Sequence, residues 1–332
     1  MIPRPYLVFL GDVDHPASAK TGFGLRDWAS DAIIGQVRLP GCCIDLGVAD
    51  MTPAEGAARG AGSLVIGVAP AGGQIAEAWI PSLRQAIEAG LDIVSGMHTR
   101  LTDIPLLVEA ADRHGRRLHD VRHADRRFPV GNGLKRPGKR ALMVGTDCAV
   151  GKKYSALAIA RELGERGVSS HFRATGQTGI MLSGDGVAID AVIADFLSGA
   201  AETLSPAADA LHWDVIEGQG SVFHPAYAGV TVGLLHGSQP DVLILCHDPS
   251  RTEIAGFPGY RVPQLDDALN LYLRLGRLTN AAVRFAGVCL NTSKFDEKTA
   301  RDIVRDTGAS LGLAATDPLR FGVANIVDAM LV

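Results

Sequence analysis

The sequence predicts an α/β protein of two domains, each built on a parallel sheet. Its 332 residues exceed the usual size of one domain, and 47% of them are hydrophobic while 20% are charged, as in well-folded globular chains. Short apolar runs alternate with segments of helical spacing, which favours strand–helix–strand units and parallel pairing. Near Asp120 the composition changes to a basic stretch rich in Gly and Pro. We therefore predict domains at 1–120 and 139–332, joined by a linker at 121–138.

The first 120 residues contain four apolar runs that we expect to form strands. These runs are Tyr6–Leu10, Gly41–Leu46, Ser63–Val68 and Asp92–Ser95, and helical spacing predicts helices at Pro53–Arg59, Ile80–Ala89 and Ile104–His114. Glycines follow several strands, at Gly11, Gly47, Gly67, Gly72 and Gly73. They serve either a ligand at the carboxyl ends of the strands or only tight turns.

The second domain is expected to begin with a strand at Arg140–Val144. Further strands are predicted at His171–Ala174, Asp214–Glu217, Val242–His247 and Phe285–Asn291, and helices at Tyr154–Arg166, Val187–Gly199, Leu265–Leu275 and Lys298–Thr307. We expect the basic linker before this domain to be solvated. The alternative is that one or two of Arg126, Arg127, Lys135 and Arg136 reach an anionic ligand.

Charge and composition argue against several classes of partner. The net charge is −4, so no global basic field holds nucleic acid. No stretch approaches the roughly 18 apolar residues that span a membrane. The five cysteines have no metal-binding pattern and are expected to be reduced. We therefore expect a cytoplasmic protein with a small-molecule substrate, neither nucleic-acid-bound nor membrane-bound, that forms a homo-oligomer.

A phosphate-binding loop, or P-loop, is indicated where the strand at Arg140–Val144 ends. The segment is Gly145, Thr146, Asp147, Cys148, Ala149, Val150, Gly151, Lys152, Lys153 and Tyr154. It lies between a predicted strand and a predicted helix, so backbone N–H groups and the positive helix end face an anion. Lys152 adds a mobile charge. We expect these residues, apart from Asp147, to bind the phosphates of a cofactor; the alternative is a plain turn.

The loop differs from that of an ordinary nucleotide triphosphatase at one position. After Gly-Lys, a Ser or Thr hydroxyl normally holds Mg²⁺, but here the residue is Lys153. Ser155 comes two positions later and should point elsewhere on the helix. A second lysine neutralises phosphate and cannot ligate a metal, so the sequence favours pyrophosphate binding without Mg²⁺. No pair of histidines has zinc-ligand spacing, and we expect no metal.

The loop resembles that of a known enzyme family. The motif GTDxxVGK and the segment Trp213–Ser221 resemble the corresponding segments of dethiobiotin synthetase, an ATP-dependent carboxylase of the P-loop superfamily. The resemblance implies that Glu217 lies near the phosphates and that Asn291 helps to hold the base. Lys153 departs from that family and puts its triphosphate chemistry in doubt.

Motifs along nearly the whole chain match another family more closely. They are KTGFGLRDW (Lys20–Trp28), GTDCAVGKKY, ATGQTGIM (Ala174–Met181), IEGQGS (Ile216–Ser221) and LCHDPSR (Leu245–Arg251). The chain resembles a former domain-of-unknown-function family that pairs a Rossmann-like N-terminal domain with a P-loop NTPase-like C-terminal domain. Some members are DgcN-type D-amino-acid N-acetyltransferases. The resemblance implies acetyl transfer from acetyl-CoA to the amine of a D-amino acid such as D-glutamate, and preference for D over L rests on it alone.

This chemistry needs a base, donors for an oxyanion and cations for the substrate carboxylates. We expect Glu217 to be the base, with a pKa raised by burial. Asp147 is a rival, although its alternative role is a loop-capping hydrogen bond. Lys152 or the loop N–H groups hold the oxyanion if the thioester lies close; if they hold only phosphates, that role falls elsewhere.

Loop residues after strands are the expected substrate contacts. They are Gln177, Thr178, Ser221, Arg251, Tyr260 and Arg261, of which the last three lie in one Gly- and Pro-rich loop suited to a lid or clamp. His224 and His247 are more typical of structural histidines. An acyl-cysteine on Cys148 is a further alternative, since a helix N-terminus lowers the pKa of a thiol.

Two other functions remain as alternatives to the acetyltransferase. One is an ATP-dependent kinase or ligase of the dethiobiotin-synthetase type, against which Lys153 speaks. The other is a regulatory protein that binds a nucleotide or CoA without turnover.

Overall fold

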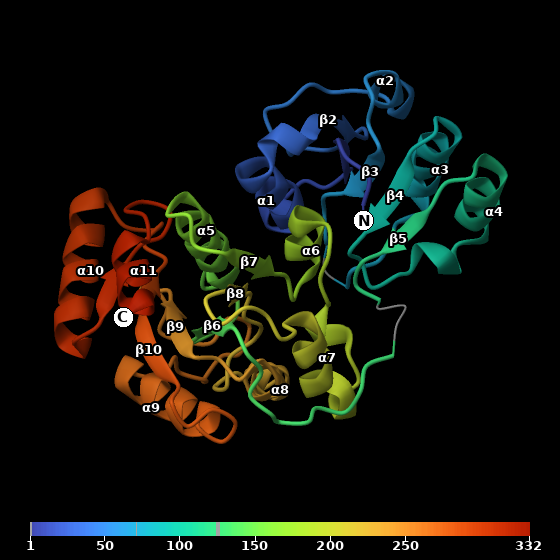
Figure 1. Cartoon of the computed structure of the whole chain (residues 1–332). Helices are drawn as coiled ribbons and strands as arrows, with labels where there is room; N and C mark the ends of the chain where they lie inside the picture. Colours follow the sequence, from blue (N-terminus) through green and yellow to red (C-terminus); the bar gives the residue numbers. More distant parts are fainter. Residues whose placement is uncertain (1, 71, 124–126) are drawn as a thin grey trace. The chain divides into compact units, whose positions relative to one another are not determined.

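The computed structural model of the chain describes residues 2–70, 72–123 and 127–332. It divides into two compact units (Figure 1), Met1–Asp125 with Gly176–Ala191, and Arg126–Thr175 with Val192–Val332. The segment Gly176–Ala191 therefore belongs to the first unit, although in the chain it interrupts the second.

The first unit is built on a five-stranded parallel sheet in the order β2-β1-β3-β4-β5. Its strands are β1 (Tyr6–Gly11), β2 (Ile33–Arg38), β3 (Ser63–Ile66), β4 (Asp92–Ser95) and β5 (Leu118–Asp120). Its helices are α1 (Lys20–Trp28), α2 (Pro53–Ala58), α3 (Ile80–Glu88), α4 (Pro105–His114) and, from the distant segment, α6 (Gln177–Ser183). All residues of β1, β3 and β4 are buried, as expected for strands covered on both faces.

One predicted strand is wrong. Gly41–Leu46 is a loop, and the strand that pairs with β1 at the sheet edge is β2. The polar Gln36 interrupts the hydrophobic pattern of β2, so this strand was not predicted. Gln36 is fully buried, and its side-chain oxygen accepts from Leu46 N at 2.8 Å while its amide donates to Asp45 at 2.9 Å. The apolar run is therefore a loop held against the sheet by a buried amide, because a buried polar side chain needs hydrogen-bond partners.

The helix α6 is anchored on the first unit by polar and apolar contacts. The hydroxyl of Thr178 lies 3.1 Å from that of Thr21 on α1, and both side chains are buried. Tyr6 donates its hydroxyl to Met181 O at 3.2 Å. Ile180, Met181 and Leu182 are also buried. This helix is thus part of the core of the first unit.

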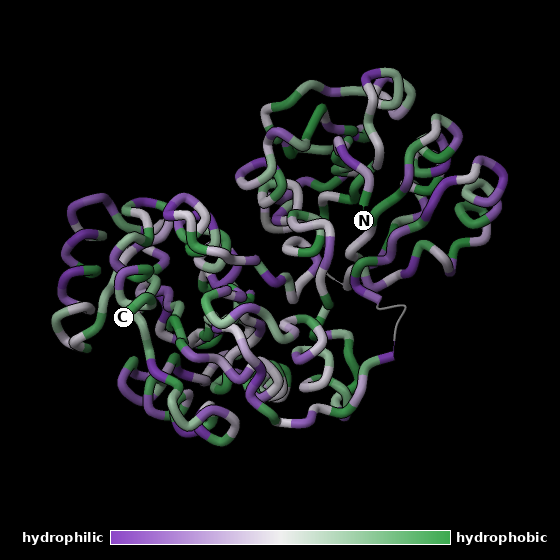
Figure 2. The backbone as a smooth tube through the Cα atoms, in the orientation of Figure 1, coloured by the Kyte–Doolittle hydropathy of each residue, from purple (hydrophilic) through white to green (hydrophobic). Residues whose placement is uncertain are grey.

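The second unit is built on a six-stranded parallel sheet in the order β11-β10-β9-β6-β8-β7. Its strands are β6 (Lys139–Gly145), β7 (Ser170–Arg173), β8 (Trp213–Ile216), β9 (Val242–His247), β10 (Arg284–Leu290) and β11 (Ala314–Thr316). Its helices are α5 (Lys152–Glu165), α7 (Leu197–Leu204), α8 (Ala228–Ser238), α9 (Leu265–Gly276), α10 (Glu297–Leu311) and α11 (Ala324–Leu331). The inner strands consist mostly of hydrophobic residues, whereas α10 is mostly hydrophilic (Figure 2).

The predicted helix Val187–Gly199 is also wrong. That range holds two short 3-10 turns, Ile189–Ala191 and Ala194–Phe196, and the α-helix is α7. The chain passes from one unit to the other between Ala191 and Val192, which interrupts the helical run. Apolar spacing alone did not reveal this break.

The linker lies on the second unit through several polar contacts. Lys135 forms an ion pair with Asp241 at 2.9 Å. The Arg136 guanidinium donates to Ser205 O at 2.9 Å and to the side-chain oxygen of Gln239 at 2.6 Å. The expectation of a solvated side chain is therefore wrong for Arg136, which is partly buried, whereas Arg127 and Lys135 are exposed as expected. Arg126 lies outside the described residues. Among the helices of the described segments, none is long and apolar enough to cross a membrane.

Candidate phosphate-binding and active site

The turn between β6 and α5 forms a nest of backbone N–H groups. Ala149 has φ +52° and Gly151 has φ +106°, and alternation of such left-handed residues with right-handed ones directs successive amides to one side. Within the described chain, the N–H groups of Ala149, Val150, Gly151 and Lys152 donate to no other protein group. Four consecutive donors at the start of a helix suit the oxygen atoms of a phosphate.

Lys152 places a cation under this nest. Its side chain is buried, and Nζ donates to Asp147 O at 2.7 Å. Burial lowers the pKa of Lys152 below its ordinary value of 10.5, although neighbouring Cys148, Cys246 and Asp147 favour the charged form. A buried ammonium without a carboxylate on Nζ is stabilised by a bound anion.

The two residues after Lys152 differ from a Mg²⁺-binding loop. The ammonium of Lys153 lies 4.8 Å from the centre of the Tyr154 ring. Ser155, the nearest hydroxyl on the helix, donates back to Gly151 O at 3.1 Å. Its side chain is buried and turned toward the helix backbone, as its spacing predicted. The loop offers cations to a phosphate where related loops offer a metal-binding hydroxyl.

Asp147 of the P-loop and Arg251 form a partly buried ion pair. Asp147 is fully buried, and its Oδ1 accepts from Cys148 N at 2.6 Å. Its Oδ2 accepts from Arg251 Nη1 at 2.8 Å and from Ala255 N at 2.9 Å. With three donors on its oxygens, Asp147 is poorly placed to take a proton from a substrate. The capping role that the sequence left open fits these contacts better.

Glu217 lies at the carboxyl end of β8, the strand next to β6 in the sheet. The side chain is 5% exposed, and Oε2 accepts from Thr175 N at 3.0 Å. The Thr175 hydroxyl donates to Glu217 O at 2.7 Å. A Cβ on the next residue, Gly218, would lie 2.9 Å from Lys152 Cδ. The structure thus brings the predicted base to the same sheet edge as the P-loop lysine.

Tyr272 on α9 is a site residue that the sequence did not reveal. It is fully buried and donates its hydroxyl to Gly145 O at 2.7 Å. The same oxygen accepts from Val222 N at 3.2 Å. Burial raises the pKa of Tyr272 to about 12, although hydrogen bonds with Val222, Ser221 and Gly145 oppose that rise. One hydroxyl therefore ties the start of the P-loop to the turn after β8, and no local motif signals it.

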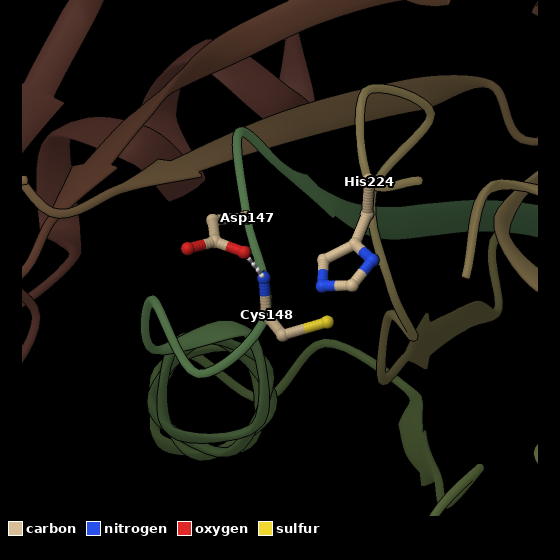
Figure 3. A group of neighbouring side chains, drawn as sticks. All are labelled: Asp147, Cys148 and His224. Carbon is tan, nitrogen blue, oxygen red and sulfur yellow. Dashed lines mark hydrogen bonds between the residues drawn. The ribbon is translucent and has the colours of Figure 1, made fainter. Parts of the chain in front are cut away.

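Cys148 and His224 face each other at the front of the loop (Figure 3). Ala226 N donates to Nδ1 of His224 at 3.1 Å, so the neutral ring carries its proton on Nε2 and is a donor there. Burial raises the pKa of Cys148, and Lys152 only partly opposes this. The expected lowering of the thiol pKa is wrong, because burial outweighs the effect of the neighbouring cations. An acyl-cysteine route is disfavoured on both counts.

His247, at the end of β9, supports the loop from another side. Its Nδ1 lies 2.9 Å from Thr146 Oγ1. Burial lowers the pKa of His247 below its ordinary value, and Arg251 acts in the same direction, whereas Asp248 opposes it. A neutral imidazole bonded to the P-loop is a structural partner, as the sequence favoured.

Other predicted substrate contacts occupy several places. Ser221 is fully buried and accepts from Phe223 N at 3.2 Å, which makes it a turn residue. Tyr260 is 54% exposed, and Ile254 N donates to Tyr260 O at 2.8 Å across a short arm that also pairs Glu253 with Arg261.

Gln177 and Thr178 belong to the first unit. Arg122 Nη1 donates to the side-chain oxygen of Gln177 at 2.6 Å. The hydroxyl of Thr178 forms a hydrogen bond with that of Thr21.

A cavity of about 220 Å³ lies beside the P-loop helix. It is lined by Val150, Gly151, Tyr154, Ser155, Cys289, Leu290, Asn291, Ser293, Asp317, Pro318 and Leu319. The lining combines apolar walls with amide, hydroxyl and carboxylate groups. A flat heterocycle with polar edges suits such a cavity, and Asn291 lines it.

Two groups of side chains bring possible metal ligands within 4.8 Å of one another. They are Asp147, Cys148 and His224 (Figure 3), and His171, His212 and Asp214. In each group an arginine already donates to the carboxylate, Arg251 at 2.8 Å and Arg173 at 2.6 Å. A bound cation would be repelled by that guanidinium, so neither arrangement favours a metal.

Comparisons with known proteins cover both units. The P-loop domain of the DUF1611 family, a domain of unknown function, matches residues 129–327, and its Rossmann-like N-terminal domain matches residues 38–124. A protein named D-glutamate N-acetyltransferase from Tritonibacter scottomollicae is 49% identical, with 99% of each chain covered. Another of that name, from a Pseudoalteromonas species, is 44% identical, with 98% of each covered.

A solved structure agrees with the fold. The crystal structure of a DUF1611 family protein from Anabaena variabilis is 34% identical and matches with a TM-score of 0.87, covering 98% of this chain and 99% of that one. The predicted pairing of a Rossmann-like and a P-loop domain is confirmed. The motifs and these matches agree, and the chain belongs to the DUF1611 family.

Proposed function

We propose that this protein is an N-acetyltransferase that moves the acetyl group of acetyl-CoA to the amine of D-glutamate. The observation that carries the proposal is the 49% identity, over 99% of both chains, to a protein named D-glutamate N-acetyltransferase. Identity at this level over the full length covers the P-loop unit and the first unit alike. The names of the relatives support D-glutamate as the acceptor and an acetyl donor such as acetyl-CoA.

The geometry of the P-loop supports acetyl-CoA as the donor. CoA carries a diphosphate and a ribose phosphate but requires no metal for acetyl transfer. The nest of four N–H groups and the buried Lys152 suit the diphosphate. Lys153 offers a further cation at the helix start, and the cavity lined by Asn291 suits the adenine. The absence of a hydroxyl at position 153 favours CoA over Mg·ATP.

Acetyl transfer joins the substrate nitrogen to the thioester carbonyl carbon. A base first removes a proton from the substrate ammonium, and the amine then attacks to form a tetrahedral oxyanion. Collapse of that oxyanion breaks the C–S bond and releases CoA as a thiolate, which takes up a proton. Glu217 is the base in this scheme, because it lies at the P-loop edge, whereas Asp147 is held by three donors.

The substrate carboxylates need cationic and hydrogen-bonding partners. Arg261 and Tyr260, on the exposed arm after β9, are the proposed partners in the second unit. Gln177 and Thr178 are not assigned this role, because their side chains bond to Arg122 and Thr21 within the first unit. Arg251 is not assigned this role, because its guanidinium is committed to the P-loop.

The proposal is tested with purified protein, acetyl-CoA and a panel of D- and L-amino acids. Release of free CoA thiol, followed with a thiol reagent, should be fastest with D-glutamate and should need no added metal. Calorimetry should show that acetyl-CoA binds more tightly than Mg·ATP. Tight binding of Mg·ATP without binding of acetyl-CoA would sink the proposal in favour of a kinase or ligase. Binding of acetyl-CoA without thiol release for any amino acid would favour the regulatory alternative.

A further inference from the structure

The Arg251 guanidinium donates to four protein groups, three of which belong to the P-loop. Nη1 donates to Asp147 Oδ2 and to Cys148 O, each at 2.8 Å, and Nη2 donates to Ala149 O at 3.1 Å. Nε donates to Asp248 Oδ2 at 3.1 Å. The side chain is 20% exposed. All three guanidinium nitrogens are therefore engaged within the second unit.

The two carbonyl contacts fix the direction of the nest. In a trans peptide, the C=O of one residue and the N–H of the next point in opposite directions. The carbonyl of Cys148 shares its peptide with the N–H of Ala149, and the carbonyl of Ala149 shares its peptide with the N–H of Val150. By holding both oxygens on its own side, Arg251 turns these two N–H groups toward the opposite side.

The two carbonyl contacts of Arg251 stabilise the loop where its backbone is strained. The strained residue, Ala149, lies between the two peptides that they hold. Ala149 has φ +52°, a conformation that costs a non-glycine residue about 1–2 kcal/mol. The anchor of the guanidinium is the fully buried Asp147, which also accepts from Ala255 N at 2.9 Å. The arrangement keeps a left-handed alanine in place before any anion arrives.

We propose that Arg251 is a positioning residue that preorganises the nest for a diphosphate and does not touch the substrate. The inference rests on the proposed function only for the identity of the anion, namely the diphosphate of CoA. Preorganisation raises affinity by removing the cost of ordering a loop on binding. It follows that Arg251 sets the affinity for the anion and leaves recognition of the amino acid unchanged.

The test measures the Kd of inorganic pyrophosphate by calorimetry, without metal, for the wild-type protein and for Arg251→Met and Arg251→Lys. Both substitutions should raise the Kd at least about 10-fold, because a lysine cannot bond two carbonyls and a carboxylate in one plane. KM for acetyl-CoA should rise in parallel, while KM for D-glutamate stays within about twofold, because the arginine is directed at the loop.

Two results would overturn the proposal. A near-normal Kd for Arg251→Lys would mean that the positive charge itself contacts the phosphate. A raised KM for D-glutamate with an unchanged Kd for pyrophosphate would mean that Arg251 binds the amino acid.

A matched control is Arg166→Met, at the far end of α5. Arg166 is 28% exposed and forms ion pairs with Glu162 at 2.7 Å and Asp328 at 2.6 Å, so its loss removes comparable contacts without touching the nest. Its Kd for pyrophosphate should match the wild-type value; an equal loss there would overturn a specific role for Arg251.

Failure of the proposed function is distinguishable from failure of this inference. If the wild-type protein binds pyrophosphate but transfers no acetyl group, only the proposed function falls, and the Kd values still decide the role of Arg251. If the wild-type protein does not bind pyrophosphate, the nest is not a diphosphate site and the inference on Arg251 falls.

Discussion

The ends of β1 and β6 are comparable places in two parallel sheets, and they have opposite surroundings. Gly11, the last residue of β1, has φ +58°, and a Cβ there would lie 2.7 Å from the Trp79 ring. Asp12 accepts from Trp79 Nε1 at 2.7 Å. After β6, four backbone N–H groups of the described chain bond to no protein group.

The difference teaches that a glycine at a strand end is not a ligand site by itself. After β1 the indole of Trp79 fills the space beside Gly11, and Asp12 accepts a hydrogen bond from that indole. After β6, Arg251 holds two peptides of the nest through their carbonyl oxygens, and Tyr272 holds Gly145 at the start of the loop. Both side chains act from outside the loop. Of the two readings that the sequence left open for the first-domain glycines, the tight turn fits Gly11, which has φ +58° and lies against Trp79.

Glu217→Gln should have the largest effect on activity. Replacing a general base by an amide should lower kcat about 10²–10⁴-fold while acetyl-CoA still binds, as measured by thiol release and calorimetry. Glu202→Gln is a matched control, because Glu202 is also buried and accepts from Asn132 N and Gly133 N at 3.0 Å, away from the P-loop. Loss of both binding and turnover in Glu217→Gln would mean that Glu217 is structural.

Lys152→Ala should abolish the binding of acetyl-CoA within the range of calorimetry, a loss of about 100-fold or more, because a buried charge opposite a phosphate is removed. Lys139→Ala, at the other end of β6, removes an exposed lysine whose Nζ lies 5.6 Å from the Trp213 ring. Its affinity should be unchanged. If Lys152→Ala binds normally, the contrast between the two strand ends loses its functional meaning.

Gly218→Ala and Gly11→Ala compare the two sheet edges directly. A Cβ at Gly218 would lie 1.7 Å from Met143 O, and one at Gly11 would meet Trp79. Each should lower the free energy of unfolding by about 1–3 kcal/mol, measured by denaturant titration. Only Gly218→Ala should also weaken acetyl-CoA binding, because it displaces Lys152 and β6. Equal losses of affinity would contradict the assignment of the donor site to the second unit.

A pH series should give the smallest effect. Burial lowers the pKa of Lys152 below 10.5, so the charged form is lost as pH rises through that lowered value. The Kd for acetyl-CoA should therefore start to increase, by several-fold in all, at a lower pH than the one at which an exposed lysine titrates. The phosphates of CoA are already ionised above about pH 7. A wild-type Kd that stays constant until an exposed lysine titrates would contradict the assignment of this titration to Lys152.

The P-loop was predictable because its information is local. The spacing of Gly145, Gly151 and Lys152 after an apolar strand is enough to place the nest, and the resemblance to dethiobiotin synthetase pointed to Glu217. Arg251 was found as a candidate, but its direction depends on the fold of a loop some 100 residues away in sequence. Tyr272 had no signal at all, because it lies on an amphipathic helix and acts through one hydroxyl.

Helix α8 shows why some of the fold could not be predicted. Its sequence contains Gly229, Gly233 and Gly237 among β-branched residues, a composition that disfavours helices. A Cβ at Gly233 would lie 2.5 Å from Leu197 Cδ2, and one at Gly237 would lie 2.2 Å from Ser198 O. Close packing against α7 therefore selects the glycines, and tertiary contact overrides helix propensity.

The membership of α6 in the first unit has a consequence for how this chain can be cut or recombined. The chain passes between the units at 125/126, 175/176 and 191/192, so a single cut at any of these points leaves a fragment that contains parts of both units. A fragment that starts at residue 139 would carry Ile180, Met181 and Leu182 without the partners that bury them. A chimera of two relatives joined in the linker would combine the Thr21 surface of one parent with the Thr178 helix of the other. An exchange that preserves the buried contacts of the first unit must therefore take α6 together with the N-terminal residues.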